Sequence, residues 1–368
     1  MTNVIPIQNL YYILLYAWDV PEQKYRVRVD AEQCHSLPNL FVQMLIGITE
    51  RLLKQGLTQE YQRKSEDVEG LRGKLCIGET MKVGRLRQGR TICEIDELTH
   101  DIHLNQIVYT TLCNSIHMEG VDPSNKERIL HLLRRFPLTN KIRLSEKVFS
   151  MVQIHRNNRF YLFVVHICQL LYQSLLPIEG SKGVYKFVDF TQNDFKMSAI
   201  FERFLMNFCK QHCKEEFPII GRTNLDFHLT PFGMVFTQDN NQAIRLLPSM
   251  QTDVTLYNPT TGRKTILDAK YYQNTLSSHY GQQGKIRREH ISQILSYVVS
   301  QENPNEPHTL HTDGILVYPT VTDDYDIAYR YNNTFHTIRV STINLNQDWQ
   351  KIEERLKDIV ERKIEFTT

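Results

Sequence analysis

Apolar residues recur along this chain at two spacings, and each spacing predicts one kind of element. A return every three or four positions, as at Phe41, Leu45 and Ile48, is typical of a helix that buries one face. Helices are predicted on this basis at residues 1–20, 38–55, 105–133, 160–176, 198–208 and 285–299. The helix at 198–208 begins with Ser198, a residue type that caps helix N-termini well.

Shorter runs rich in apolar and β-branched residues predict strands at 246–257, 264–272 and 313–319. One predicted helix precedes these strands and another lies between the last two. Earlier, between about residues 68 and 98, glycines separate short strand-like runs, which predicts a small β-barrel or meander. We therefore expect an α+β or α/β chain with sheet structure in both halves.

A cluster of turn-forming residues at 258–262 joins the first two of these later strands and predicts an antiparallel hairpin. If Asn258 faces Arg263 across a four-residue loop, counting back along both strands places Asp253 directly opposite Asp268. Their Cβ atoms would then lie about 5 Å apart. The hairpin is thus expected to bring two carboxylates together.

This carboxylate pair is the strongest chemical signal in the chain. Lys270 shares a face with Asp268, whereas Ala269 points the other way. Like charges that face each other destabilise a sheet, and a Mg²⁺ ion would remove the conflict because it binds one or two carboxylates plus phosphate oxygens. The other interpretation is a solvated hairpin with ordinary surface charges, since Asp-x-Lys also arises by chance.

The chain has 368 residues, enough for two domains with separate cores. We expect an N-terminal domain at 1–150 without a catalytic signature and a C-terminal domain at 151–368 that carries the acidic pair. The net charge of +2 is not that of a strongly basic protein that binds DNA alone. Either basic residues gather on one face, or a partner supplies much of the contact with DNA.

Several sequence features bear on compartment and nucleotide use. Seven cysteines, scattered mostly through apolar stretches, indicate reduced thiols and not a disulfide framework. No run reaches the roughly 18 apolar residues that span a bilayer, and no basic segment typical of a signal peptide precedes the apolar run at 10–18. We expect a cytoplasmic protein. Because the chain lacks a Gly-x-x-x-x-Gly-Lys-Ser/Thr loop, it is not expected to hydrolyse a nucleotide by itself.

The order of elements and the Asp-x-Lys motif resemble the PD-(D/E)-x-K nuclease superfamily. More narrowly, the chain resembles the McrC nuclease subunits of McrBC-type modified-cytosine restriction systems. The segments that carry this resemblance are 5–18, 72–75, 93–97, 250–253 and 268–272. The resemblance implies a C-terminal restriction-endonuclease-like core, in which helices flank a mixed sheet, after an N-terminal domain of helices plus a small β module.

Site residues follow from the resemblance by position. It implies that Asp253, Asp268 and the backbone carbonyl of Ala269 bind the catalytic Mg²⁺, and that Lys270 is the catalytic lysine. Thr252 stands where the motif has proline, a departure that leaves the chemistry unchanged because that proline contributes no ligand.

Five further positions have two interpretations each. Glu202 is either an additional carboxylate of the metal site or a helix acid that complements the helix dipole. Gln293 either contacts the catalytic site or DNA, or faces solvent. The basic residues Lys285, Arg287 and Arg288 either bind DNA phosphates or form a solvated charge run.

The resemblance also implies partners. In the family, a separate AAA+ GTPase called McrB forms a ring, recognises modified cytosine and translocates double-stranded DNA, while the McrC-like subunit stimulates the GTPase and hydrolyses phosphodiester bonds. Residues 1–150 would then dock into the ring, with GTP bound by the partner and Mg²⁺ by this chain. Two alternatives stay open: a stand-alone Mg²⁺-dependent structure-specific or repair nuclease, and a non-catalytic activator subunit.

Overall fold

The computed structural model describes residues 5–21, 36–155, 159–178, 184–229, 245–271, 286–322, 324–332 and 334–362. The chain divides into two compact units. Unit 1 comprises Met1–Arg26 and Asp189–Thr368, and unit 2 comprises Val27–Val188. The C-terminal unit therefore begins later than the expected residue 151 and also takes in the first helix.

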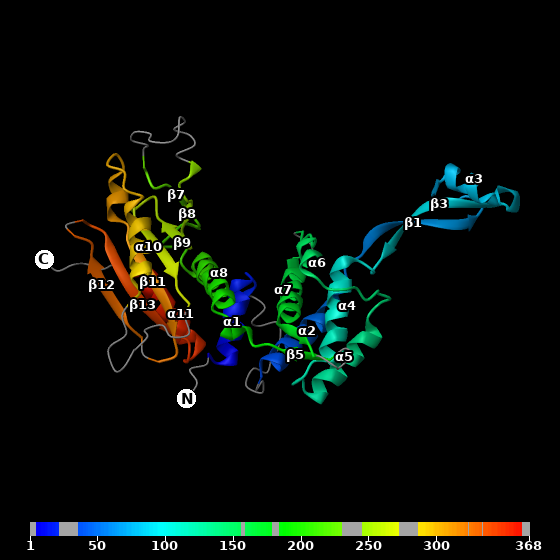
Figure 1. The fold of residues 1–368 in the computed structure, drawn as a ribbon, viewed down its shortest axis with the longest axis horizontal. Coiled ribbons are helices and arrows are strands. Elements are labelled where there is room, and N and C mark those ends of the chain that lie inside the picture. The colour runs from blue at the N-terminus through cyan, green and yellow to red at the C-terminus, as the bar shows by residue number, and fades with distance from the viewer. Residues whose placement is uncertain are drawn as a thin grey trace. The chain divides into compact units, whose positions relative to one another are not determined.

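Unit 1 is built on a six-stranded mixed sheet (Figure 1). The strand order is β12-β13-β11-β10-β9-β6. The bounds are β6 Ile219–Gly221, β9 Val254–Tyr257, β10 Lys264–Ala269, β11 Asp313–Thr320, β12 Asp326–Arg330 and β13 Thr337–Asn344. Strands β10, β11 and β13 run parallel, and the remaining pairs are antiparallel. The expected mixed sheet in the C-terminal part of the chain is confirmed.

The helices that the structure describes in unit 1 include α1 Ile7–Ala17, α8 Asp194–His212, α10 Arg288–Val299 and α11 Trp349–Glu361. Short 3₁₀ turns lie at Phe190–Gln192 and Pro307–His311. Helix α10 covers the face that carries Ile266 and Ile338. Helix α11 lies on the opposite face, because Arg339, the neighbour of Ile338, donates to the carbonyl of Ile359 in α11. Helix α1 packs on α8 through Tyr16 and Phe204, which explains its place in unit 1.

The close fit of α10 on the sheet depends on Gly314 in β11. A Cβ atom at this position would lie 2.7 Å from Ile294 and 2.9 Å from Val298, both in α10. These distances are shorter than van der Waals contact, so glycine is what lets the helix approach the strand this closely. The approach matters because α10 also delivers a side chain to the site described below.

The predicted hairpin register is confirmed. The amide of Asn258 donates to the carbonyl of Arg263 at 2.9 Å, and Leu267 pairs with Val254. The first strand is, however, not continuous over 246–257. It consists of β8, Met250–Gln251, which pairs with β7, Asn224–Leu225, and of β9.

The interruption lies at Thr252 and Asp253. The amide of Thr252 donates to the carbonyl of Thr223 at 3.0 Å, and the Thr252 hydroxyl accepts from the Thr223 amide at 2.9 Å. These bonds hold Thr252 against the neighbouring segment. The Asp253 side chain is then available for a different contact.

The helix expected at 198–208 is longer than predicted, and its cap is different. Helix α8 begins at Asp194, and the Asn193 side chain caps it by accepting from the Lys196 amide at 2.9 Å. Ser198 lies inside the helix, where its hydroxyl donates to the carbonyl of Tyr271 at 3.4 Å. Serine is common at caps but not confined to them, so the prediction placed the start one turn late.

Unit 2 contains a group of packed helices. They are α2 Leu37–Gln55, α4 His103–Ile116, α5 Pro123–Arg135, α6 Glu146–Ser150 and α7 Arg159–Ser174, with a small sheet of β4 Leu175–Pro177 and β5 Tyr185–Phe187. The apolar stripe predicted for 38–55 is confirmed, since Phe41, Leu45 and Ile48 are fully buried.

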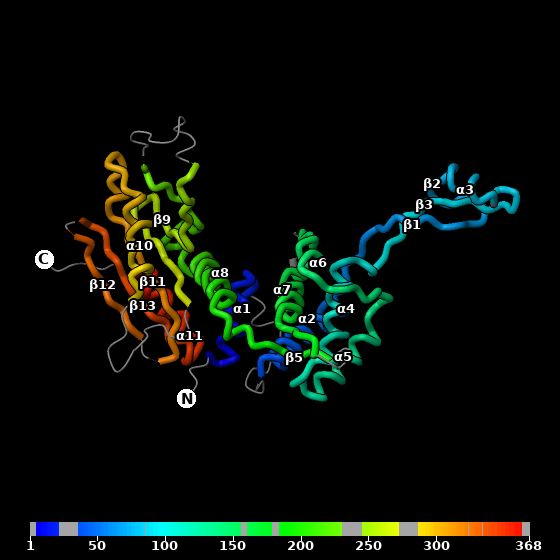
Figure 2. The backbone as a smooth tube through the Cα atoms, in the orientation of Figure 1, coloured from blue at the N-terminus to red at the C-terminus, as the bar shows by residue number. Residues whose placement is uncertain are grey.

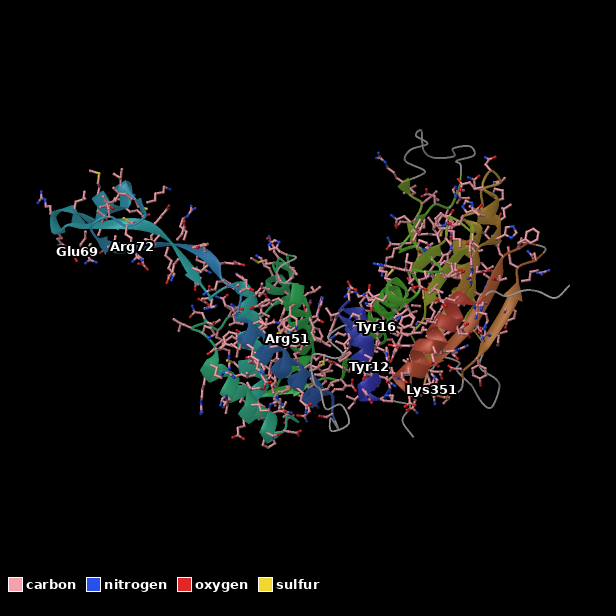
Figure 3. The ribbon with its side chains drawn as sticks, turned by 180° about the vertical axis from the view of Figure 1, so that it is seen from behind. Tyr12, Tyr16, Arg51, Glu69, Arg72 and Lys351 are labelled. Atoms are coloured by element: carbon pink, nitrogen blue, oxygen red, sulfur yellow. The ribbon has the colours of Figure 1, made fainter. Side chains whose placement is uncertain are left out.

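A long two-stranded ribbon extends from these helices within unit 2 (Figure 2). It is formed by β1, Glu60–Glu69, and β3, Arg90–Thr99, which pair over their whole length. Between them lie β2 Lys74–Leu75, α3 Ile77–Val83 and a 3₁₀ turn at Arg85–Gln88. Figure 3 labels Glu69 and Arg72 at the end of the ribbon that is remote from the helices.

The ribbon corrects the expected β-barrel or meander. The strand order β1-β3-β2 is not that of a meander, and a three-stranded sheet does not close. The residues of β1 are all exposed or half-buried, and in β3 only Thr91 and Cys93 are buried. These strands therefore bury too little apolar surface to form the interior of a barrel.

Candidate functional site

The site lies at the C-terminal end of β10, on the face that α10 covers. Asp268 follows the core residue Ile266 on this face and is fully buried. The Nζ atom of Lys270 lies 2.7 Å from Oδ2 of Asp268 and donates a hydrogen bond of 2.8 Å to Oε1 of Gln293 in α10. The structure thus brings Asp268, Lys270 and Gln293 together.

Gln293 is fixed from a second direction. Its Nε2 donates to the hydroxyl of Tyr297 at 2.7 Å. Because Oε1 accepts from Lys270 and Nε2 donates to Tyr297, the amide has one orientation that satisfies both contacts. Gln293 therefore holds the Lys270 ammonium in place and does not merely face solvent.

Asp253 reaches the same end of β10 from the neighbouring segment. Its Oδ2 accepts the backbone amide of Ala269 at 2.8 Å. The carboxylate therefore takes a hydrogen bond that a strand partner would otherwise accept. Asp253 and Asp268 lie close enough that each changes the pKa of the other, as the predicted cross-strand placement requires.

Burial dominates the electrostatics of the two acids. It raises the pKa of Asp268 to about 7, with a further increase from the Asp253 charge and an opposing effect of Lys270. Burial also raises the pKa of Asp253, against the amide of Ala269 and the positive charges of Lys270 and Arg222. Oδ2 of Asp268 is paired with the Lys270 ammonium, whereas Oδ1 has no hydrogen-bond partner among the residues that the structure describes.

This arrangement fits a divalent cation. Burial of two carboxylates is costly unless positive charge compensates them, and Lys270 pairs directly with Asp268, whereas Arg222 acts on Asp253 from a partly exposed position. Within the described ranges, no group of three or more His, Cys, Asp or Glu side chains is placed to hold a metal. Two carboxylates with further oxygens from substrate match Mg²⁺, whereas a structural zinc site takes four protein ligands.

Glu202 lies near the site but pairs with another residue. Its Oε2 is 3.2 Å from Nη2 of Arg222. Burial and then the charge of Asp253 raise the Glu202 pKa, while Arg222 and Lys270 oppose this increase. The carboxyl group is therefore within electrostatic reach of the site, and its direct contact is an arginine.

The basic residues predicted to bind DNA are Lys285, Arg287 and Arg288. Lys285 lies outside the described residues. Arg287 and Arg288 are exposed at the start of α10. Burial, and then the positive charges of Lys270 and Arg287, lower the pKa of His290 to about 4. DNA binding by Arg287 and Arg288 stays a prediction.

Sequence reasoning missed two residues near the site. Tyr297 stands four positions after Gln293, so helical spacing could have suggested that their side chains meet. Arg222 follows the short strand β6, whose three residues gave no strand signal. The carbonyl of Ala269 stays a predicted ligand without further evidence.

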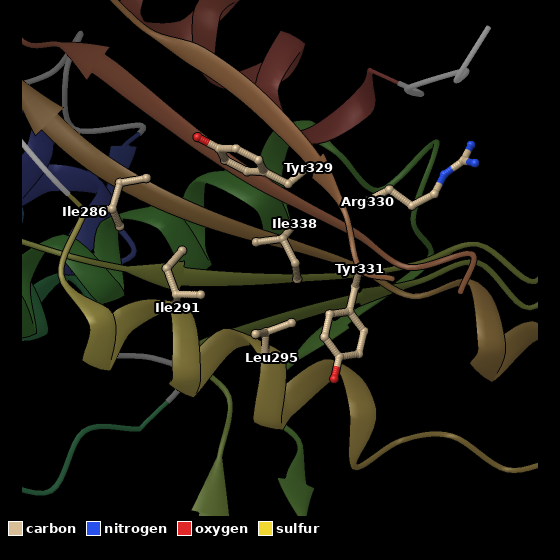
Figure 4. Close-up of a pocket in the computed structure, with 7 residues that line it drawn as sticks. All are labelled: Ile286, Ile291, Leu295, Tyr329, Arg330, Tyr331 and Ile338. Atoms are coloured by element: carbon tan, nitrogen blue, oxygen red, sulfur yellow. The ribbon is translucent and has the colours of Figure 1, made fainter. Parts of the chain in front are cut away.

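Two of the hollows in the described part of unit 1 lie elsewhere. One encloses about 320 Å³, and its lining residues are Ile286, Ile291, Leu295, Tyr329, Arg330, Tyr331 and Ile338 (Figure 4). Arg330 points away from the apolar side chains in this view. The other, about 520 Å³, has a polar lining that includes Lys264 and Glu302. Their lining residues do not include Asp253 or Asp268.

Comparisons with known proteins agree on one family. A family model described as McrBC 5-methylcytosine restriction system component matches residues 6–319. A relative from Escherichia coli (strain K12), described as the type IV methyl-directed restriction enzyme EcoKMcrBC, is 28% identical over 356 residues, which cover 97% of each chain. The resemblance inferred from the sequence segments is confirmed.

A solved structure shares the fold. It is a half-complex from a tetradecameric assembly of Thermococcus gammatolerans McrB AAA+ hexamers with bound McrC. The match has a TM-score of 0.55 and 16% identity, and it covers 97% of this chain and 75% of that chain. Among the helices that the structure describes here, none is long and apolar enough to cross a bilayer.

Proposed function

The chain belongs to the family of McrBC 5-methylcytosine restriction system components, and we propose that it is the Mg²⁺-dependent DNA-cutting subunit of such a system. The observation that carries the proposal is the buried Asp268 carboxylate. Its Oδ2 forms an ion pair with Lys270, its Oδ1 has no hydrogen bond from the described residues, and Asp253 lies beside it. A restriction-endonuclease-like core that presents Asp253, Asp268 and Lys270 accounts for the placement of all three residues.

Each residue has a proposed part in hydrolysis of the phosphodiester bond. Asp253, Asp268 and the Ala269 carbonyl would hold Mg²⁺, which supplies charge neutralisation on the phosphate and activation of water. Lys270 stabilises negative charge that develops on the phosphate. Gln293 keeps the Lys270 ammonium directed at the site through its 2.8 Å hydrogen bond. The Ala269 amide fixes the Asp253 carboxylate.

The proposed partner is an McrB-like AAA+ GTPase ring that binds GTP and reads the modified cytosine in double-stranded DNA. The structural relative is described as McrC bound to McrB hexamers. We assign docking to unit 2 and no longer to residues 1–150, because the first helix packs in unit 1. The DNA-cutting site belongs to unit 1.

The end of the ribbon offers the best docking surface in unit 2. Its exposed apolar side chains are Leu71, Ile77, Met81, Val83 and Leu86, with exposed fractions from 52% to 71%. Contiguous apolar side chains on a surface are typical of a protein interface. The proposed occupant is the GTPase ring, and stimulation of its GTPase activity is the measurable consequence.

The proposal is tested with the full chain and its neighbouring GTPase. Plasmid DNA containing 5-methylcytosine is incubated with both proteins, with and without Mg²⁺ and GTP. We expect nicking only when all components are present. The Asp253→Ala, Asp268→Ala and Lys270→Ala variants should lose nicking while they keep the stimulation of GTP hydrolysis.

Two alternative functions give different results in the same assay. A stand-alone structure-specific or repair nuclease would cut with Mg²⁺ alone, without the partner or GTP. A non-catalytic activator would stimulate GTP hydrolysis, and the complex would cut equally well with any of the three variants. The close contact of Lys270 with Asp268 in a buried setting favours the catalytic proposal over the activator.

A further inference from the structure

Arg222 lies next to the proposed cutting site although it is distant from Asp253 in sequence. It follows β6 directly, and the backbone of the next residue, Thr223, forms hydrogen bonds with both the amide and the hydroxyl of Thr252. Thr252 immediately precedes Asp253. The same two segments pair again at Asn224 and Gln251. Strand pairing therefore fixes the backbone of Arg222 beside the backbone that presents Asp253.

The Arg222 side chain is held on one side and open on the other. Its Nη2 lies 3.2 Å from Oε2 of Glu202, and its Nη1 donates to Oε1 of Gln251 at 3.5 Å. The side chain is 45% exposed. A guanidinium group has five N–H donors, and contacts with described residues use two of them. Donors are left for an acceptor that arrives from solvent.

Folding stability gives little reason for this pair. An ion pair that is partly exposed contributes little, because solvent screens it and both side chains lose freedom. The ion pair instead keeps the guanidinium beside the segment that presents Asp253, where it is close enough to act on an anion in the site.

We propose that Arg222 binds a backbone phosphate of DNA next to the cut position, and that Glu202 positions it. The planar guanidinium donates two parallel hydrogen bonds to phosphate, which Lys270 cannot do. Glu202 holds one edge of the guanidinium and directs the remaining donors outward. This inference rests on the proposed cutting function and gives Glu202 a role other than metal binding.

The test uses the full chain with its partner GTPase, Mg²⁺ and GTP. The variants are Arg222→Gln, Arg222→Lys, Glu202→Gln, and Glu202→Gln with Arg222→Gln. Arg203→Gln is the matched control, because Arg203 is an exposed residue next to Glu202 and loses the same charge. Nicking is measured against DNA concentration at several salt concentrations.

For Arg222→Gln we expect the KM for DNA to rise about tenfold, while kcat changes much less, because a charged hydrogen-bonded contact is lost. The slope of log affinity against log salt should fall by about one, as for loss of one phosphate contact. Arg222→Lys should keep the salt slope of the unmodified chain. Its KM for DNA should rise, but by less than in Arg222→Gln. The double variant should be no worse than Arg222→Gln, because Glu202 acts through Arg222.

Direct binding of Mn²⁺ to the protein without DNA separates the two roles of Glu202. We expect Glu202→Gln to bind Mn²⁺ as the unmodified chain does, and Asp268→Asn to bind it much more weakly. Weaker Mn²⁺ binding by Glu202→Gln would overturn the positioning role. An unchanged salt slope in Arg222→Gln, or an equal loss in Arg203→Gln, would overturn the phosphate contact.

Failure of this inference differs from failure of the proposed function. If Asp253→Ala abolishes nicking but Arg222→Gln behaves as the unmodified chain, only the phosphate contact is wrong. If Asp253→Ala nicks normally, the cutting function itself is wrong, and the Arg222 inference is wrong with it.

Discussion

Acidic and basic residues lie side by side in two regions of this protein, in very different surroundings. On the ribbon of unit 2, Glu97 contacts Lys64, and Asp96 lies 3.6 Å from Arg63, with the acids 51% and 64% exposed. At the end of β10, Asp268 has no exposed surface and lies 2.7 Å from Lys270. Water and salt screen the first set and hardly reach the second.

The difference teaches that burial, not the presence of an acid near a lysine, marks the chemical site. The ribbon pairs keep a long exposed sheet soluble and in register. The buried pair instead leaves Oδ1 of Asp268 without a hydrogen bond from a described residue, where the proposed cation would bind. Four predictions test this comparison, beginning with the largest expected effect.

The first compares the two acids directly in the cutting assay. Asp268→Asn should lower nicking by the full complex about a thousandfold or more, because the cation loses a charged ligand. Glu97→Gln should change nicking less than about twofold, because its ion pair is exposed. GTP hydrolysis by the partner should persist in Asp268→Asn. A near-normal nicking rate for Asp268→Asn would contradict the distinction between the buried and the exposed acid.

The second compares two arginines by urea unfolding. Arg339 is buried, donates to both carboxylate oxygens of Asp326 and donates to the Ile359 carbonyl. Arg339→Ala should lower the free energy of unfolding of unit 1 by about 3–5 kcal/mol, because Asp326 loses its buried partner. Arg63→Ala on the ribbon should cost less than about 1 kcal/mol. Equal losses at both positions would contradict the comparison.

The third compares a strand glycine with a helix glycine, neither of which has a φ in the left-handed region. Gly314→Ala places a Cβ 2.7 Å from Ile294 in α10 and should destabilise unit 1 by about 1–3 kcal/mol. At Gly78, in α3 of the ribbon, a Cβ would meet nothing within 4 Å. Gly78→Ala should therefore be neutral or stabilise by up to about 1 kcal/mol. Thermal unfolding of both variants gives the answer.

The fourth concerns acid stability and should have the smallest effect. Burial alone would raise the pKa of Asp326, but hydrogen bonds from Ser341 and Arg339 and the charges of Arg339 and Arg355 lower it below 3.8. The folded state then binds the proton more weakly than the unfolded state, so this stabilisation is present above pH 3.8 and is lost as the pH falls through the folded pKa. The free energy of unfolding, measured with urea, should fall less steeply between pH 7 and pH 3 for Asp326→Asn than for the unmodified chain. Identical pH profiles would contradict the role of Asp326.

Much of unit 1 could be predicted from local patterns. The turn at 258–262 and the alternation along two strands were enough to place Asp253 opposite Asp268, and the register of β9 and β10 agrees. The spacing in α10 gave its buried face. These features depend on a period of two or 3.6 residues and on a short loop, and both are set by residues that are close in sequence.

Other features could not be predicted because they depend on residues that are distant in sequence. The sequence predicts a barrel or meander where the structure has the ribbon, since its glycines and short apolar runs do not reveal that the residues of β1 are all exposed or half-buried. The place of the first helix in unit 1 depends on Tyr16 meeting Phe204, nearly 200 positions away. Arg222 lies near the site because it follows β6, a strand too short to be predicted from the sequence.

The sequence by itself determined which residue types stand on which face of the hairpin, because alternation and loop length are local properties. It left open whether those residues are exposed surface charges or a buried cluster. Only the tertiary structure decided this, since α10 must pack on Gly314 before Asp268 is buried and Gln293 reaches Lys270. Burial changes the energy of a charge, and burial is supplied by segments that the local pattern does not contain.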